Sequence, residues 1–69
     1  MNDLQVVLNG KTEIVETEMN LLDFLLEKGL NPETIIVEYN GKIVKKDEWL
    51  NIMLQDNDSL EVLKFVGGG

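Results

Sequence analysis

Several side chains on which enzymes commonly rely are missing from this chain, which argues against catalysis by its own side chains. The sequence has no Cys and no His. These absences exclude thiolate nucleophiles, disulfides, Cys-based metal sites and the side chain best suited to proton transfer near neutral pH. Arg is absent as well. We therefore expect a protein that is not an enzyme, with no catalytic residue, no metal and no bound cofactor of its own.

The group best placed for chemistry is the carboxylate at the end of Phe65-Val66-Gly67-Gly68-Gly69. Glycine loses the most backbone entropy on folding and buries no side chain, so this tail adds little to a folded body. Two interpretations stay open from composition alone. The tail is either a cloning or linker remnant, or a segment used outside the folded domain. We predict a folded domain over residues 1–66 and a flexible tail over residues 67–69.

Length and charge restrict the kind of partner. The chain has 69 residues, 43% of them hydrophobic, which predicts one small domain with a single core. Thirteen acidic residues against six Lys give a net charge of −7, which disfavours nucleic acid and anionic membranes and favours a basic protein partner. No apolar run approaches the roughly 20 residues of a membrane span, and the N-terminus does not resemble a secretory signal. We expect a soluble, cytoplasmic protein that is monomeric when isolated.

Two Asn-Gly pairs predict two hairpins, because both residue types tolerate the positive φ of a type I′ turn. The first joins strands at 4–8 and 11–15, and the second joins strands at 34–39 and 42–44. A strict two-residue turn sets Val6 opposite Glu13, so a longer loop or a bulge in the first hairpin remains an alternative.

A helix is predicted between the hairpins. Asn20 is a good N-cap, and Gly29 stands at the usual stop position. Leu22, Leu25 and Leu26 share one face at helical spacing, with Leu21 beside them, and we expect these leucines to lie in the core. Asp23 at the third helical position suits the positive helix end, and Met19 is expected to pack on Phe24.

The last third of the sequence predicts a turn or short helix starting near Asp47 and then a strand over 59–66. Trp49 is expected to cap the small core. The first and last strands are the most apolar, so we place them side by side, parallel, at the centre of a sheet covered on one face by the helix. Leu60 and Val62 should then face the helix, together with Leu4 and Val6.

Leu63 and Phe65 should lie on the other face of this sheet, which no remaining element is available to cover. They would share it with the middle of the strand at 34–39. An uncovered apolar patch beside a tail predicts a docking surface for partners.

This β-β-α-β-β-β order, ending in Gly-Gly, resembles the α+β β-grasp fold of ubiquitin, and above all the ThiS family of thiazole-biosynthesis sulfur carriers. The resemblance covers essentially the whole chain. Its motifs are Asn9-Gly10, the helix leucines, Val37-Glu38, Asn40, Ile43-Val44, Trp49, Asp56-x-Asp58 and the final stretch from Glu61 to Gly69. Many such carriers have a residue other than Gly at position 67, so Gly67 is expected to act as a spacer.

The resemblance implies a carrier whose reactive group is the carboxylate of Gly69. An E1-like adenylyltransferase would activate it with ATP, and a sulfur donor would then convert it to a thiocarboxylate for a thiazole synthase that makes the thiazole of thiamin. Gly67 and Gly68 would thread the narrow channel of the partner's active site, and Leu63 and Phe65 would dock. Three alternatives stay open: a molybdopterin synthase small subunit, a ubiquitin-like protein modifier, and a non-reactive interaction module with a fusion scar.

Overall fold

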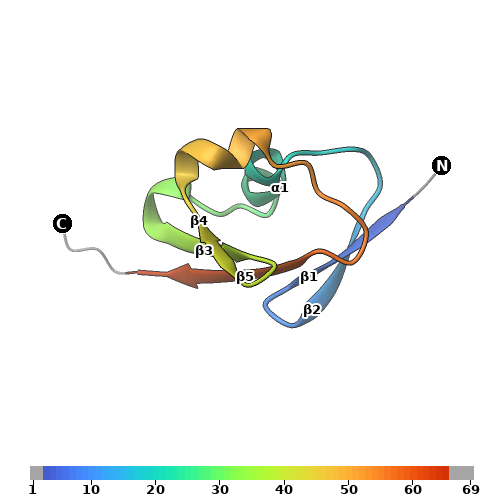
Figure 1. Cartoon of the computed structure of the whole chain (residues 1–69), viewed down its shortest axis with the longest axis horizontal. Coiled ribbons are helices and arrows are strands. Elements are labelled where there is room, and N and C mark those ends of the chain that lie inside the picture. The colour runs from blue at the N-terminus through green and yellow to red at the C-terminus, as the bar shows by residue number, and fades with distance from the viewer. Residues whose placement is uncertain (1–2, 66–69) are drawn as a thin grey trace.

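The computed structural model describes residues 3–65 and arranges them as one mixed five-stranded sheet with an α-helix across one face (Figure 1). The strands are β1 (Leu4–Leu8), β2 (Lys11–Val15), β3 (Ile35–Tyr39), β4 (Lys42–Val44) and β5 (Ser59–Lys64). The helical segments are α1 (Leu21–Glu27) and two short 3-10 helices, η1 (Pro32–Thr34) and η2 (Lys46–Asn51). Of the turn or short helix expected near Asp47, the structure has the short helix, η2.

The strand order is β2-β1-β5-β3-β4, with β1 and β5 parallel at the centre. In Figure 1 the strands lie along the lower side of the molecule, and α1 and η2 lie above them. The expected α+β β-grasp arrangement is confirmed, including the interior position of the last strand. The strand predicted over 59–66 ends at Lys64, and residue 66 lies outside the described residues.

The first hairpin has the plain two-residue turn, and neither the bulge nor the longer loop occurs. Asn9 and Gly10 take φ values of 52° and 82°, as a type I′ turn requires. Val6 does stand opposite Glu13. This register is tolerated because Nζ of Lys28 donates a hydrogen bond to Oε1 of Glu13 at 2.7 Å. The same contact lowers the pKa of Glu13, against a smaller opposing effect of burial.

Both ends of α1 are capped as the sequence predicts. Oδ1 of Asn20 accepts a hydrogen bond from the backbone N–H three residues on, at 2.8 Å. At the other end Gly29 has a φ of 78°, and the N–H of Leu30 turns back to the carbonyl of Leu25 at 3.1 Å. This return bond is the mark of a Schellman motif, which stops the helix and satisfies one of its last carbonyls.

The buried face of α1 differs from the prediction. Leu21, Phe24 and Leu25 are almost fully buried, whereas Leu26 is 50% exposed and Leu22 is half-buried. The prediction for Leu26 was therefore wrong. A helix of two turns has one narrow contact stripe, and here the stripe at i, i+3 and i+4 is set by Leu21 and includes the aromatic ring.

Trp49 belongs to the core, as expected, and is 1% exposed. Its Nε1 donates to the carbonyl of Val44 at 3.1 Å, which satisfies the one polar atom of the indole. The core between the sheet and the helical layer consists of the following buried residues: Val6, Val15, Leu21, Phe24, Leu25, Ile35, Val37, Trp49, Leu54, Leu60 and Val62.

Among residues 3–65, none of the helices has the length and apolar character of a membrane span.

Candidate functional site

Two of the five predicted site residues fall within the described structure, and they lie together at the end of β5. Leu63 is the last but one residue of the strand, and Phe65 follows its final residue. The other three, Gly67, Gly68 and Gly69, lie outside residues 3–65. The geometry of the candidate site is therefore that of the platform from which the tail leaves.

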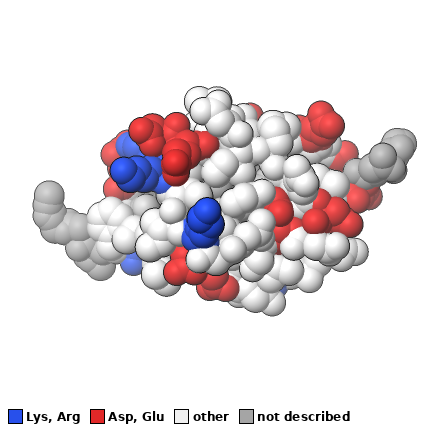
Figure 2. All heavy atoms as spheres, viewed as in Figure 1, with Lys and Arg blue, Asp and Glu red and all other residues white. Residues whose placement is uncertain are grey.

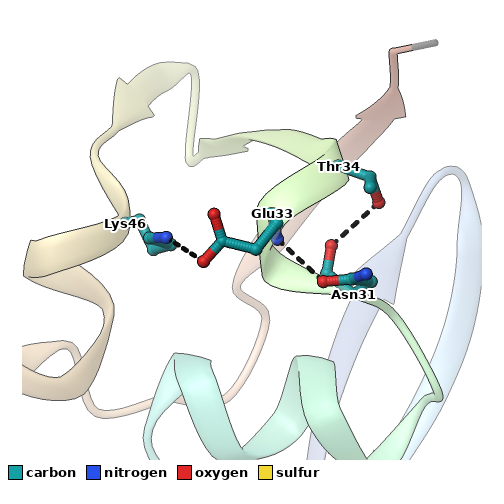
Figure 3. A network of polar contacts seen from close by, with 4 residues as sticks. All are labelled: Asn31, Glu33, Thr34 and Lys46. Atoms are coloured by element: carbon teal, nitrogen blue, oxygen red, sulfur yellow. Dashed lines mark hydrogen bonds and ion pairs between the residues drawn. The ribbon is translucent and has the colours of Figure 1, made fainter. Parts of the chain in front are cut away.

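The end of β5 is fixed by the turn that precedes β3. The N–H of Phe65 donates to the carbonyl of Thr34 at 3.0 Å, so the sheet ladder continues one residue past the strand. Thr34 is itself held, because its Oγ1 donates to the carbonyl of Asn31 at 2.9 Å (Figure 3). Oδ1 of Asn31 accepts from the N–H of Glu33 at 3.0 Å, and an ion pair joins Glu33 to Lys46. The end of β5 is thus connected by hydrogen bonds to η1, and η1 is joined to η2 by the ion pair.

The side of the sheet opposite α1, which we call the open face, has no covering element among the described residues. Side chains alternate along a strand, so the burial of Val62 on the helix side places Leu63 on the open face. The antiparallel register pairs Leu63 with Ile36 of β3. The prediction that these positions share a face is confirmed.

Four large apolar side chains gather on this face near the end of β5. We call them the terminal patch: Ile36, Ile43, Leu63 and Phe65, with exposed fractions of 42%, 68%, 60% and 45%. Ile43 was missed as a site residue. The second Asn-Gly turn could have revealed it, because a two-residue turn fixes which residue of β4 shares a face with Glu38.

A side-chain amide extends the contact between β1 and β5 beyond the last residue of β1. The N–H of Val62 donates to Oδ1 of Asn9 at 2.7 Å, and Nδ2 of Asn9 donates to the carbonyl of Val62 at 3.2 Å. The amide therefore acts as one more residue of the neighbouring strand. It holds the middle of β5 at Val62, one residue before Leu63, the first patch residue of this strand.

A buried carboxylate organises the other end of β5. Asp58 is 6% exposed and accepts hydrogen bonds from the hydroxyl of Tyr39 at 2.8 Å, the N–H of Gln55 at 2.8 Å and Nδ2 of Asn40 at 3.1 Å. Burial, followed by the hydrogen bond to Asp58, raises the pKa of Tyr39 to about 12. Sequence reasoning matched Asp58 to the family motif but did not predict that it would be buried.

These contacts hold the fold together around β5. The polar groups of Asp58 and Asn9 are used to hold strands and turns together. In the described part of the chain, no three acidic residues lie close enough together to hold a metal ion. What the site presents is an apolar sheet face ending where the glycine tail begins.

Comparison with known proteins gives a consistent family assignment. The ThiS family model matches residues 2–69. The sulfur carrier protein ThiS of Bacillus subtilis is 35% identical over 63 residues, which span 90% of this chain and 96% of that protein. The crystal structure of the thiamine biosynthesis protein ThiS from Geobacter metallireducens superposes with a TM-score of 0.82. It is 28% identical, covering 96% of this chain and all of that one.

One further relative is much longer. A thiazole synthase of Magnetococcus marinus is 33% identical over 66 residues, which are 96% of this chain but only 20% of that protein. The chain thus spans about a fifth of this relative, and the matched segment there is part of a polypeptide named for thiazole synthesis.

Proposed function

The chain belongs to the ThiS family, and on that footing we propose that it carries sulfur as a thiocarboxylate on the terminal carboxylate of Gly69. An adenylyltransferase would catalyse attack of this carboxylate on the α-phosphorus of ATP, with pyrophosphate as the leaving group. A sulfur nucleophile from a donor would then attack the acyl carbon and displace AMP. The net change is the replacement of one carboxylate oxygen by sulfur.

The observation that carries this proposal is the continuity between the central strand and the tail. β5 is hydrogen-bonded on one side by Asn9 as far as Val62, and on the other side by β3 and Thr34 as far as the N–H of Phe65. Gly69 is the fourth residue after Phe65, a covalent reach of roughly 13 Å when the chain is extended. A firmly held strand followed by that length of chain suits delivery of a terminal group into the site of another protein.

The composition of the chain supports the same chemistry. Without Cys, no side-chain thiol can carry sulfur as a persulfide. Glycines without Cβ atoms allow the close backbone approach and the unusual φ values that a narrow channel demands. The groups that activate the carboxylate would belong to the partner, which binds the ATP.

Docking on this partner would use the terminal patch. Leu63 and Phe65 are both exposed and lie directly before the tail, so a protein that receives Gly69 must also cover them. Burial of a large apolar side chain at such an interface contributes on the order of 1.5–3 kcal/mol, and aromatic anchors often dominate binding. Capture of the tail and docking on the open face would therefore act together.

The receiving pathway is proposed to be thiazole synthesis. The similarity to a segment of a longer thiazole synthase favours this choice, because proteins that are joined in one chain in one organism commonly act together in another. A molybdopterin synthase partner is the competing possibility. The two are separated by incubating the sulfur-loaded chain with each purified synthase and measuring which one returns it to the carboxylate.

The experiment that tests the function itself is reconstitution. The chain is incubated with the adenylyltransferase of its source organism, ATP and a sulfur donor, and its intact mass is measured. We expect a gain equal to the exchange of one oxygen for sulfur, dependent on ATP. An unchanged mass with an enzyme that is active on its own known carrier would contradict the proposal.

A further inference from the structure

Two carboxylates stand directly opposite each other on the open face. Glu38 of β3 pairs with Glu61 of β5 in the antiparallel register. The hydrogen bonds between Asn40 and Ser59, and between Phe65 and Thr34, show which pairs of this ladder are hydrogen-bonded. Hydrogen-bonded and non-hydrogen-bonded pairs alternate along an antiparallel ladder, so Glu38 and Glu61 also form a hydrogen-bonded pair. The Cα atoms of such a pair lie about 5.5 Å apart, and both side chains are on the same face.

Neither Glu38 nor Glu61 has an ion-pair partner among the described residues. The side-chain ion pairs within residues 3–65 are Lys28 with Glu13 and Lys46 with Glu33. Lys64 is the neighbour of Leu63 along β5, but it alternates to the helix side of the sheet. Like charges directly opposite on a sheet destabilise it, so the folded chain carries a repulsion that a cation from another molecule would relieve.

The neighbours of the pair are apolar on the side toward the end of β5, whereas Asn40 and Ser59 lie on the other side. Leu63 is two residues from Glu61 along β5, Ile36 is two residues from Glu38 along β3, and Ile43 stands directly opposite Glu38 on β4. The two carboxylates therefore border the terminal patch, which is the surface that a partner would cover. Once solvent is excluded there, an ion pair is worth more than the small amount typical of exposed surface pairs.

We propose that a partner protein seated on the terminal patch places an arginine between Glu38 and Glu61. The inference rests on the proposed function, which supplies that partner as the adenylating enzyme. Arginine is the fitting cation because its planar guanidinium has five donors and can engage two carboxylates at once. It is also enriched in interface cores, from which lysine is depleted.

The net charge of −7 does not by itself make this contact. Acidic residues are spread over the molecule, as one face shows in Figure 2, where blue atoms are fewer than red ones. A general attraction to a basic partner would depend equally on all of them. Glu38 and Glu61 differ from the other acidic residues in three respects. They pair directly with each other, they lie on the open face, and they border the terminal patch.

The test compares isosteric neutral variants at matched positions. Glu38→Gln and Glu61→Gln each remove one charge from the open face, while Glu27→Gln removes one from α1, where the side chain is exposed and has no hydrogen-bond or ion-pair partner among the described residues. Binding to the adenylating enzyme of the source organism is measured by calorimetry in the presence of ATP, at low and at high salt. Thermal unfolding of each free variant shows that it is folded.

Each open-face variant should weaken binding at least tenfold at low salt, as expected for loss of a charge-assisted contact, and Glu27→Gln should stay within twofold of the parent chain. The difference should shrink at high salt. Open-face variants that are folded and bind like the parent overturn the inference. An equal loss in Glu27→Gln also overturns it, because total charge would then explain the effect.

The same samples separate this inference from the function on which it rests. With saturating enzyme and a sulfur donor, intact mass reports thiocarboxylate formation independently of affinity. Unchanged affinity together with normal sulfur gain refutes the arginine contact and leaves the carrier function standing. Absence of sulfur gain in the parent chain refutes the carrier function, and absence of any binding by the parent chain refutes both.

Discussion

The hydroxyl of Tyr39 donates a hydrogen bond to Oδ2 of Asp58 over 2.8 Å, and this contact ties the end of β3 to the turn that leads into β5. Asp58 is almost fully buried and has two further donors around it. The start of β5 is thereby fixed, as its end is fixed by the bond between Phe65 and Thr34. The strand that presents the tail is held at both ends by groups that take no part in the proposed chemistry.

Titration of Tyr39 should show this contact directly. The folded-state pKa of about 12 lies above the ordinary value of 10.0, chiefly because of burial. A group whose pKa is raised in the folded state contributes stability that is full below its unfolded pKa and is lost as pH rises through the folded value. Stability should therefore fall between about pH 10 and pH 12, and less so in Tyr39→Phe.

The measurement is the ultraviolet absorbance of phenolate, which is unambiguous because the chain has one Tyr. The folded protein should titrate near 12, and protein unfolded in denaturant near 10. A folded-state midpoint at the ordinary value would contradict the buried contact.

Asn9→Gly should destabilise the domain although it suits the backbone. Glycine accepts the φ of 52° at this position at no steric cost, but the variant loses both amide bonds to Val62. Two such bonds predict a loss of about 1–3 kcal/mol in the free energy of unfolding, measured by urea denaturation. Asn57→Gly, at an exposed turn position of similar φ whose side chain makes no hydrogen bond among the described residues, is the matched control and should be close to neutral.

Leu25→Ala and Leu26→Ala should differ sharply, although the two residues are adjacent. Leu25 is fully buried, so its truncation should lower the free energy of unfolding by about 2–5 kcal/mol. Leu26 is half exposed, and its truncation should change stability by about 0.5 kcal/mol or less. Equal effects of the two substitutions would contradict the orientation of α1, which turns Leu25 into the core and leaves Leu26 half exposed.

The adjacent leucines also show where sequence reasoning fails. The hairpins could be predicted because Asn-Gly fixes turn type and register locally, and the ends of α1 because their caps are local too. Which leucine of α1 faces the sheet depends on tertiary packing around Phe24 and Trp49. The burial of Asp58 depends on three donors brought together by the fold, which no single stretch of sequence reveals.

The residues of the candidate site also differ in how far the sequence predicts them. Leu63 and Phe65 could be placed on the uncovered face from strand alternation and from the lack of a second helix. Ile43 was missed, although the two-residue Asn-Gly turn fixes the register that sets it beside Glu38. Glu38 and Glu61 lie opposite each other only because β3 pairs with β5 in this register. The two strands are separated by the 19 residues between Tyr39 and Ser59, and no local signal predicts their register.

Phe65→Ser should weaken binding to the adenylyltransferase at least tenfold while the free domain stays folded. The side chain is 45% exposed, so its removal takes little from the core and much from the terminal patch. Circular dichroism and calorimetry on the same sample provide the test. Loss of the fold would mean that Phe65 is a core residue, and an intact fold with unchanged affinity would refute docking through the patch.

Removal of Gly68 and Gly69 should separate folding from function. The two residues bury no side chain, so we expect the free energy of unfolding to change by about 0.5 kcal/mol or less. Sulfur transfer should be lost altogether. A clearly lowered melting temperature would show that the tail packs against the body of the protein.

Sulfur should reside on the carboxylate of Gly69 and nowhere else. After reaction with the adenylyltransferase, ATP and a sulfur donor, fragmentation of the intact chain in a mass spectrometer locates the added sulfur. Every fragment that carries the oxygen-to-sulfur exchange should contain Gly69, and fragments that end before Gly69 should have unchanged masses. Sulfur found on a fragment that lacks Gly69 would contradict this expectation.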